Sequence, residues 1–177
     1  EDAFQDLLFH MTKHNIHEVY AVATSALRDA SNAKQVISLI KKQTGIEIEV
    51  INGSTEAGLI KTAIENIISL KGKIALLIDI GGGSTEITLT KNNKIITSKS
   101  YQYGTVRLLE SINSNNIEKD IEHFSSKVKS YLQKNLNGQE INLCVGTGGN
   151  LRRMGKIRFQ IFKKPTNRVT LVELNAM

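Results

Sequence analysis

The segment Asp79-Ile80-Gly81-Gly82-Gly83-Ser84-Thr85-Glu86 follows directly on an almost continuous apolar run over residues 73–79. Such a run predicts a strand in the middle of a sheet. Three consecutive glycines allow the chain to turn sharply, so that successive backbone N–H groups point into one concavity that suits phosphate oxygens. A carboxylate at the strand end, Asp79, and the hydroxyls of Ser84 and Thr85 at the rim favour the same function. We therefore predict a phosphate-binding turn at this point.

The segments that follow the turn exclude two common phosphate loops. No Gly-Lys-Ser/Thr follows the glycines, as a Walker loop requires, and residues 85–90 predict a strand where a dinucleotide-binding motif has a helix. A tight hairpin whose glycines serve geometry alone is the alternative. The Asn92-Asn93 pair and a further β-rich run at 95–101 predict an antiparallel meander.

The rest of the chain predicts alternating helices and strands, and hence the α/β class. In the first half we predict helices at 2–14, 31–45 and 54–72, with Ser31 and Ser54 as N-caps, and strands at 18–24 and 46–51. This alternation favours a largely parallel sheet covered by helices. In the second half we predict helices at 104–109 and 117–136, a strand at 141–145 and then a basic helix. The expected domain boundary lies at residues 70–72.

Composition bounds the remaining possibilities. No apolar stretch has the length of a membrane span, and the single cysteine, Cys144, in an apolar run and expected to be buried, favours a cytoplasmic location. The net charge of +6 is uneven, because residues 1–71 hold 7 basic and 9 acidic side chains whereas residues 72–177 hold 16 and 8. An anionic partner for the second half, or an acidic remainder outside this chain, would explain the excess of basic side chains in residues 72–177. The chain begins without a methionine, and we expect it to be a fragment.

Four segments, in this order and spacing, resemble the exopolyphosphatase/guanosine pentaphosphate phosphatase (Ppx/GppA) family of the actin-like ATPase superfamily. They are ATSALRDASN at 23–32, INGSTEA at 51–57, DIGGGSTE at 79–86 and GTGG at 146–149. The resemblance covers nearly the whole chain. It implies an actin-like (ribonuclease-H-like) fold, with residues 1–71 as the later part of the first domain and 72–177 as most of the second.

The resemblance also implies roles for individual residues. Glu56, near the positive end of a predicted helix, matches the glutamate that activates the attacking water, and Arg28 matches an arginine that binds phosphate. Many family members have a second acid before the glutamate, where this chain has Thr55. The other residues expected to bind phosphate are Ser25, Gly81, Gly82, Gly83, Ser84, Gly146 and Gly148. Asp79 and Glu86 are the expected ligands of Mg²⁺, and alternation along the strand places Glu86 on the side of Ser84.

By resemblance, the reaction is hydrolysis of a terminal phosphoanhydride of inorganic polyphosphate or guanosine pentaphosphate (pppGpp), with release of orthophosphate. The superfamily uses two phosphate loops, and the first would precede Glu1, so we expect the isolated fragment to have little activity. A homodimer of the full-length protein is a further expectation. A polyanion- or nucleic-acid-binding module using the basic 152–168 segment is the alternative, although aromatic residues are only 5% of the chain, which disfavours base stacking and a specific nucleic acid partner. Another actin-like phosphotransferase, such as a kinase, is a third.

Overall fold

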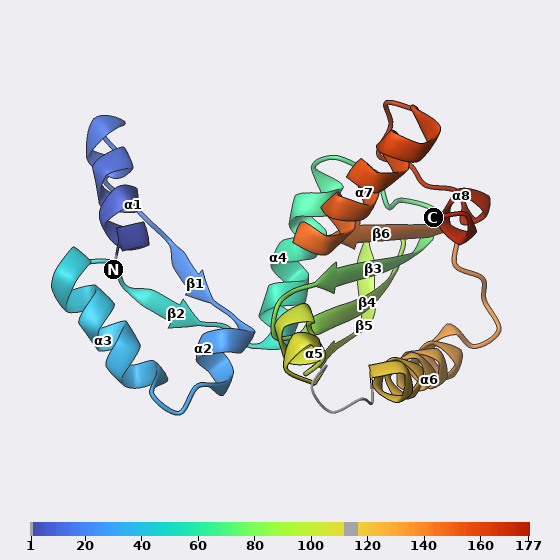
Figure 1. The fold of residues 1–177 in the computed structure, drawn as a ribbon, viewed down its shortest axis with the longest axis horizontal. Helices are drawn as coiled ribbons and strands as arrows, with labels where there is room; N and C mark the ends of the chain where they lie inside the picture. Colours follow the sequence, from blue (N-terminus) through green and yellow to red (C-terminus); the bar gives the residue numbers. More distant parts are fainter. Residues whose placement is uncertain (1, 112–116) are drawn as a thin grey trace. The chain divides into compact units, whose positions relative to one another are not determined.

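The chain folds into two compact units, Glu1–Glu56 and Ala57–Met177. The structure, a computed structural model, describes residues 2–111 and 117–177 (Figure 1). The division lies inside helix α4 (Gly53–Glu65), and therefore before the boundary at residues 70–72 that the sequence suggested. The difference arises because Ile64 and Leu70 pack against Ala75 and Leu77 in one hydrophobic cluster of the second unit. The assignment of residues 1–71 and 72–177 to two actin-like domains stays a prediction.

The first unit has helices α1 (Asp2–Lys13), α2 (Ser25–Asp29) and α3 (Ala33–Thr44) and strands β1 (Ala21–Ala23) and β2 (Ile48–Val50). The two strands pair in parallel, with Ala21 opposite Ile48, which confirms the expected parallel order. Both strands are shorter than predicted, and α2 was not predicted at all.

The helix ends of this region differ from the sequence prediction in detail. Gly45 closes α3 in the left-handed conformation (φ 74°), as predicted, but the N-cap of α3 is Asn32 and not Ser31. At the start of α4, Asn52 Oδ1 accepts from the Thr55 N–H at 2.9 Å, and the Ser54 hydroxyl donates to the same oxygen at 2.6 Å. Asn52, and not Ser54, is therefore the capping side chain, because its amide oxygen accepts a hydrogen bond from the N–H of the third residue after it, Thr55.

The second unit is built on a four-stranded sheet in the order β5-β4-β3-β6. Its strands are β3 (Ile74–Ile80), β4 (Thr85–Lys91), β5 (Lys94–Tyr101) and β6 (Leu143–Thr147). The first three form the expected antiparallel meander, and β6 joins β3 in parallel. Asn92 (φ 50°) and Asn93 (φ 65°) make the tight β4–β5 turn, since a two-residue hairpin of this kind needs positive φ at both positions.

Helices cover both faces of this sheet (Figure 1). On one face Ala75 and Leu77 of β3 pack with Ile64 and Leu70. On the other, Leu76 packs with side chains of α6 (Ile117–Leu136), as the alternation of side chains along a strand requires. The remaining helices are α5 (Thr105–Ser111), α7 (Gly149–Phe162) and α8 (Leu171–Asn175). The carboxyl end of the central strand β3 thus opens into the glycine turn.

The structure tests two expectations that were drawn from the composition. Cys144 is exposed on β6, which is an edge strand, so the expectation of a buried cysteine was wrong. Within residues 2–111 and 117–177, every helix is too short or too polar to cross a bilayer.

Candidate functional site

The glycine turn joins β3 to β4 and is closed by a hydrogen bond from the Gly81 N–H to the Ser84 carbonyl (3.0 Å). The need for glycine here is one of space. A Cβ on Gly82 would lie 3.1 Å from Val106 Cγ2, and neither Gly81 nor Gly82 has a positive φ. Close approach of α5 therefore explains Gly82 better than the left-handed conformation does, and at Gly81 the neighbour is the Ser84 carbonyl, 3.3 Å from a Cβ.

The N-terminus of α5 holds the carbonyl groups of the turn. The backbone N–H groups of Thr105 and Val106 donate to the carbonyls of Gly81 (3.1 Å) and Gly82 (2.8 Å). Arg107 Nε donates to the Gly83 carbonyl at 2.7 Å. In the part of the chain that the structure describes, the N–H groups of Gly82, Gly83 and Ser84 have no hydrogen-bond partner. Three donors of the turn are thus available for an anion, whereas the Gly81 N–H is used within the turn itself.

Two carboxylates face each other beside the turn. Asp79 and Glu86 are directly opposite in the antiparallel β3–β4 pair, so their side chains leave the same face of the sheet. Glu86 is 3% exposed, and its Oε1 accepts from the hydroxyls of Ser84 (2.6 Å) and Ser100 (2.8 Å). The expectation that Glu86 lies on the side of Ser84 is confirmed, and a role as a solvated surface glutamate is excluded.

The second glycine turn lies against the same place. Asp79 is opposite Thr147 in the parallel β3–β6 pair, and a Cβ on Gly148 would lie 2.7 Å from Asp79 Oδ1. Gly148 has a φ of 91° and is the N-cap of α7, whose first turn therefore has no side chain capping its N–H groups from that position. Asn150 Nδ2 adds a hydrogen bond to the Ile80 carbonyl (3.3 Å). Gly148 is thus required by both backbone conformation and space.

Gly146 has a packing explanation, because a Cβ there would meet Leu151 Cδ1 at 2.3 Å. It lies within β6 and not in the turn that follows. Its predicted contact with phosphate stays a prediction.

The predicted residues of the first unit form a separate group. Arg28 Nη1 donates to the Ile51 carbonyl at 3.0 Å and to Glu56 Oε2 at 3.3 Å. The arginine thus pairs with Glu56, in the first turn of α4. Ser25, at the start of α2, is 5% exposed, and its hydroxyl has no hydrogen-bond partner within the described residues. An unsatisfied buried hydroxyl in the same short helix as a partly buried arginine suits an incoming phosphate oxygen.

The structure therefore brings the candidate residues together in two groups, one in each unit. Sequence reasoning missed the contribution of residues 104–107, Asn150 and Ser100. A glycine directly before a helix, Gly104, was the one available signal, and it resembles Gly148 before α7.

The donor set beside the turn fits Mg²⁺. No group of three or more His, Cys, Asp or Glu side chains with the geometry of a metal site occurs among the described residues. Mg²⁺, however, is commonly bound by one or two carboxylates together with substrate phosphates and waters, and Asp79 and Glu86 supply that number. The hard oxygen ligands of this pair suit Mg²⁺ and not a thiolate-preferring metal.

The basic segment at residues 152–168 is less available to an anion than its sequence suggested. Arg158 is 2% exposed and makes two hydrogen bonds to Glu173, at 3.0 and 3.1 Å. Lys164 contacts the same carboxylate at 2.9 Å. Hydrogen bonds from Arg158 above all, and then from the Thr170 N–H and Lys164, lower the pKa of Glu173 to about 2. Arg158 therefore orders the chain end, and the expectation that it belongs to a polyanion-binding row was wrong.

Comparison with known proteins agrees with the family resemblance of the four sequence segments. A model of the Ppx/GppA phosphatase family matches residues 2–177. The chain is 35% identical over 91 residues to exopolyphosphatase 1 of Mycobacterium tuberculosis H37Rv, a match that covers 51% of this chain and 26% of the relative. It is 38% identical over 107 residues to the guanosine-5'-triphosphate,3'-diphosphate pyrophosphatase of Pseudoalteromonas translucida, covering 60% of this chain and 21% of the relative.

Solved structures show the same fold. An exopolyphosphatase from Cytophaga hutchinsonii superposes with a TM-score of 0.82 at 26% identity, over 93% of this chain and 55% of that one. The Aquifex aeolicus member of the family superposes with a TM-score of 0.67 at 23% identity, over 92% and 53%. The predicted actin-like α/β fold is confirmed. The matched part is about a quarter of the length of the curated relatives and about half of the solved chains.

Proposed function

The chain belongs to the Ppx/GppA phosphatase family, and on this basis we propose that it takes part in hydrolysing the terminal phosphoanhydride of polyphosphate or pppGpp. One observation carries the proposal. The carbonyls of residues 81–83 are bonded to α5, whereas the N–H groups of residues 82–84 have no partner among the described residues and are available to phosphate, with the Asp79–Glu86 pair beside them. Preorganised donors of this kind stabilise developing negative charge without having to reorganise during the reaction.

Each group in the proposed mechanism has one task. The N–H groups of the turn and of the first turn of α7 would hold phosphate oxygens, in the way that helix N-termini bind anions. Arg28 would bind a further phosphate oxygen and fix the Glu56 carboxylate that it contacts. Glu56 would accept the proton of a water whose oxygen attacks the terminal phosphorus. The bond to the bridging oxygen breaks, and the shortened phosphate chain leaves with that electron pair.

Asp79 and Glu86 would hold Mg²⁺ through their carboxylate oxygens, since these face one another across β3 and β4. When bound, the ion would offset negative charge on the transferring phosphoryl group. The hydroxyls of Ser84 and Ser100 would keep the Glu86 carboxylate oriented.

The test is release of orthophosphate, measured with malachite green, from polyphosphate and from pppGpp by the full-length protein, with Mg²⁺ or with EDTA. We expect Glu56→Gln to lower kcat by roughly 100- to 10,000-fold, the usual contribution of a general base. Glu65→Gln, the same change in the same helix at a side chain paired with Lys61, is the control and keeps the rate. Equal rates for Glu56→Gln and wild type would refute the role of Glu56, and no release from either substrate would refute the function.

A further inference from the structure

The peptide groups of the glycine turn are oriented by hydrogen bonds on one side. The three carbonyls of residues 81–83 accept from the N-terminal residues of α5, at 3.1, 2.8 and 2.7 Å. The peptide groups here are trans. In a trans peptide the C=O and the N–H of the same group point in opposite directions. The N–H groups of residues 82–84 therefore point away from α5, which defines the side of the turn where an anion would bind.

One of these bonds depends on the side chain of Arg107. Backbone N–H groups of Thr105 and Val106 hold the first two carbonyls, so a side-chain substitution leaves those donors in place. The third carbonyl, that of Gly83, accepts from Arg107 Nε at 2.7 Å. A bond from a guanidinium is charge-assisted, and therefore stronger than a bond between neutral groups. Arg107 thus holds the peptide group whose N–H belongs to Ser84.

The surroundings of Ser84 show what this bond adds. The Ser84 hydroxyl donates to Glu86 Oε1 at 2.6 Å, and its carbonyl accepts the Gly81 N–H at 3.0 Å. The residue is 4% exposed. Its side chain and the peptide group after it are therefore already held, and Arg107 holds the peptide group before it. All the polar groups of Ser84 are then oriented, with its N–H directed to the anion side.

The position of Nε separates two ways in which an arginine beside such a turn can act. A guanidinium could bind a phosphate oxygen directly. Arg107 Nε, however, is bound on the carbonyl side of the turn, opposite to the N–H groups. Its effect on an anion is therefore transmitted through the peptide group between Gly83 and Ser84.

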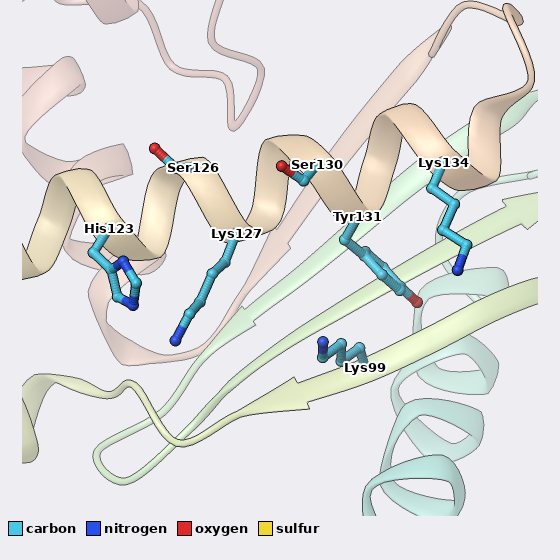
Figure 2. Close-up of a pocket in the computed structure, with 7 residues that line it drawn as sticks. All are labelled: Lys99, His123, Ser126, Lys127, Ser130, Tyr131 and Lys134. Atoms are coloured by element: carbon cyan, nitrogen blue, oxygen red, sulfur yellow. The ribbon is translucent and has the colours of Figure 1, made fainter.

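A lysine on the other face of the sheet offers a charge control. Ser100 bonds to Glu86, so Lys99, the neighbouring residue of β5, extends from the opposite face. Figure 2 shows Lys99 there, facing Lys127 and Tyr131 of α6. Removing its charge changes the net charge of the same unit and leaves the contacts of the turn intact.

We propose that Arg107 is a positioning residue for phosphate, a role that rests on the proposed function of the turn. Its guanidinium holds the Gly83 carbonyl, and through it the Ser84 N–H, in the orientation that binds a phosphate oxygen. The hydrogen bond, and not the charge, carries this role. A neutral N–H donor at the same place therefore preserves it.

Two substitutions separate the hydrogen bond from the charge. Glutamine carries Nε2 the same number of bonds from Cα as arginine carries Nε, so Arg107→Gln keeps a donor at this place and removes the charge. Arg107→Met removes both, and Lys99→Gln removes one charge from the other face. Binding of inorganic phosphate to the ¹⁵N-labelled protein is followed at the amide signals of residues 82–84, below the melting temperature of every variant.

We expect Arg107→Met to weaken phosphate binding at residues 82–84 roughly three- to tenfold, about the contribution of one hydrogen bond. Arg107→Gln and Lys99→Gln should stay within about twofold of wild type. Equal losses in both Arg107 variants would show that the charge acts on phosphate directly, and wild-type affinity in Arg107→Met would show that the bond is not needed. Either result overturns the role of Arg107 and leaves the proposed function standing. Absence of binding at residues 82–84 in wild type would instead refute the proposed use of the turn.

A second measurement depends on neither a ligand nor the stability of a variant. Scalar coupling across the hydrogen bond, from Arg107 ¹⁵Nε to the Gly83 carbonyl ¹³C, should be detectable in the wild-type protein, because the two heavy atoms of the bond are 2.7 Å apart. The same coupling should appear from the glutamine ¹⁵Nε2 in Arg107→Gln. Its absence from wild type would refute the contact, and its absence from Arg107→Gln together with full phosphate affinity would refute positioning through this bond.

Discussion

The contact between Gly104 and the glycine turn makes a sharp prediction for Gly104→Ala. A Cβ at this position would lie 2.3 Å from the Gly82 carbonyl oxygen, 2.5 Å from the Gly82 carbonyl carbon and 2.7 Å from the Gly83 carbonyl carbon. All three are backbone atoms, so the helix or the turn must move by about 1 Å to restore ordinary contact. That movement would stretch the 2.8 Å bond from the Val106 N–H to the Gly82 carbonyl beyond bonding distance.

The cost follows from these two effects. Overpacking of this kind costs about 1–3 kcal/mol, and each weakened hydrogen bond costs about 1 kcal/mol. A total of about 3 kcal/mol corresponds to a melting temperature lower by roughly 6–12 °C for a chain of this size. Thermal unfolding followed by circular dichroism measures it, and the amide signals of residues 82–84 should shift at the same time.

Gly155→Ala is the matched control, because it lies inside α7 and a Cβ there would contact nothing within 4 Å. Alanine is the better helix former by about 1 kcal/mol, so this variant should melt at the same temperature or slightly higher. If the melting temperature of Gly104→Ala lies within about 1 °C of the control, the close contact between α5 and the turn is refuted. Such a difference corresponds to a loss of stability below about 1 kcal/mol.

Three further predictions concern stability. The pKa of Glu173 is lowered from 4.5 to about 2, mainly by Arg158, so its stabilising effect is complete above pH 4.5 and is lost as the pH falls toward 2. The difference in melting temperature between wild type and Glu173→Gln should therefore narrow over that range, and a constant difference would contradict the pairing. Leu77→Ala, at a side chain 2% exposed, should cost about 2–5 kcal/mol in urea unfolding, whereas Leu109→Ala, 62% exposed, should cost less than about 0.5 kcal/mol. Asn52→Ala removes the cap of α4 and should lower the free energy of unfolding by about 1 kcal/mol, measured in urea. If the free energy of unfolding is unchanged, Asn52 is not the cap.

The elements of the second unit could be predicted because local patterns determine them. The apolar run before Asp79 occupies the middle of the sheet, and the Asn92-Asn93 pair makes the turn that its sequence favours. The same holds for the Asp79–Glu86 pair, since strand register follows from a short turn and side-chain alternation. Gly45 and the amphipathic pattern of α6 were equally local signals.

Features that depend on distant contacts could not be predicted. Arg158 differs from its basic neighbours through its contacts with Lys164, Thr166 and Glu173, which lie six to fifteen residues further on, so its burial has no local signal. The role of Gly104 depends on the approach of α5 to a turn more than twenty residues earlier. The cap of α4 shows a third limit, because Asn52 and Ser54 are both good capping residues and only the backbone path selects one.

The hydrogen bonds between α5 and the glycine turn have one more consequence. The N–H groups of Thr105 and Val106 and the Nε of Arg107 connect the helix to three successive carbonyls, so we expect the turn and the helix to move together. We expect a ligand that displaces the turn to displace α5 as well. A fluorophore attached at Leu109, which is solvent-exposed, would report events at the turn without touching it.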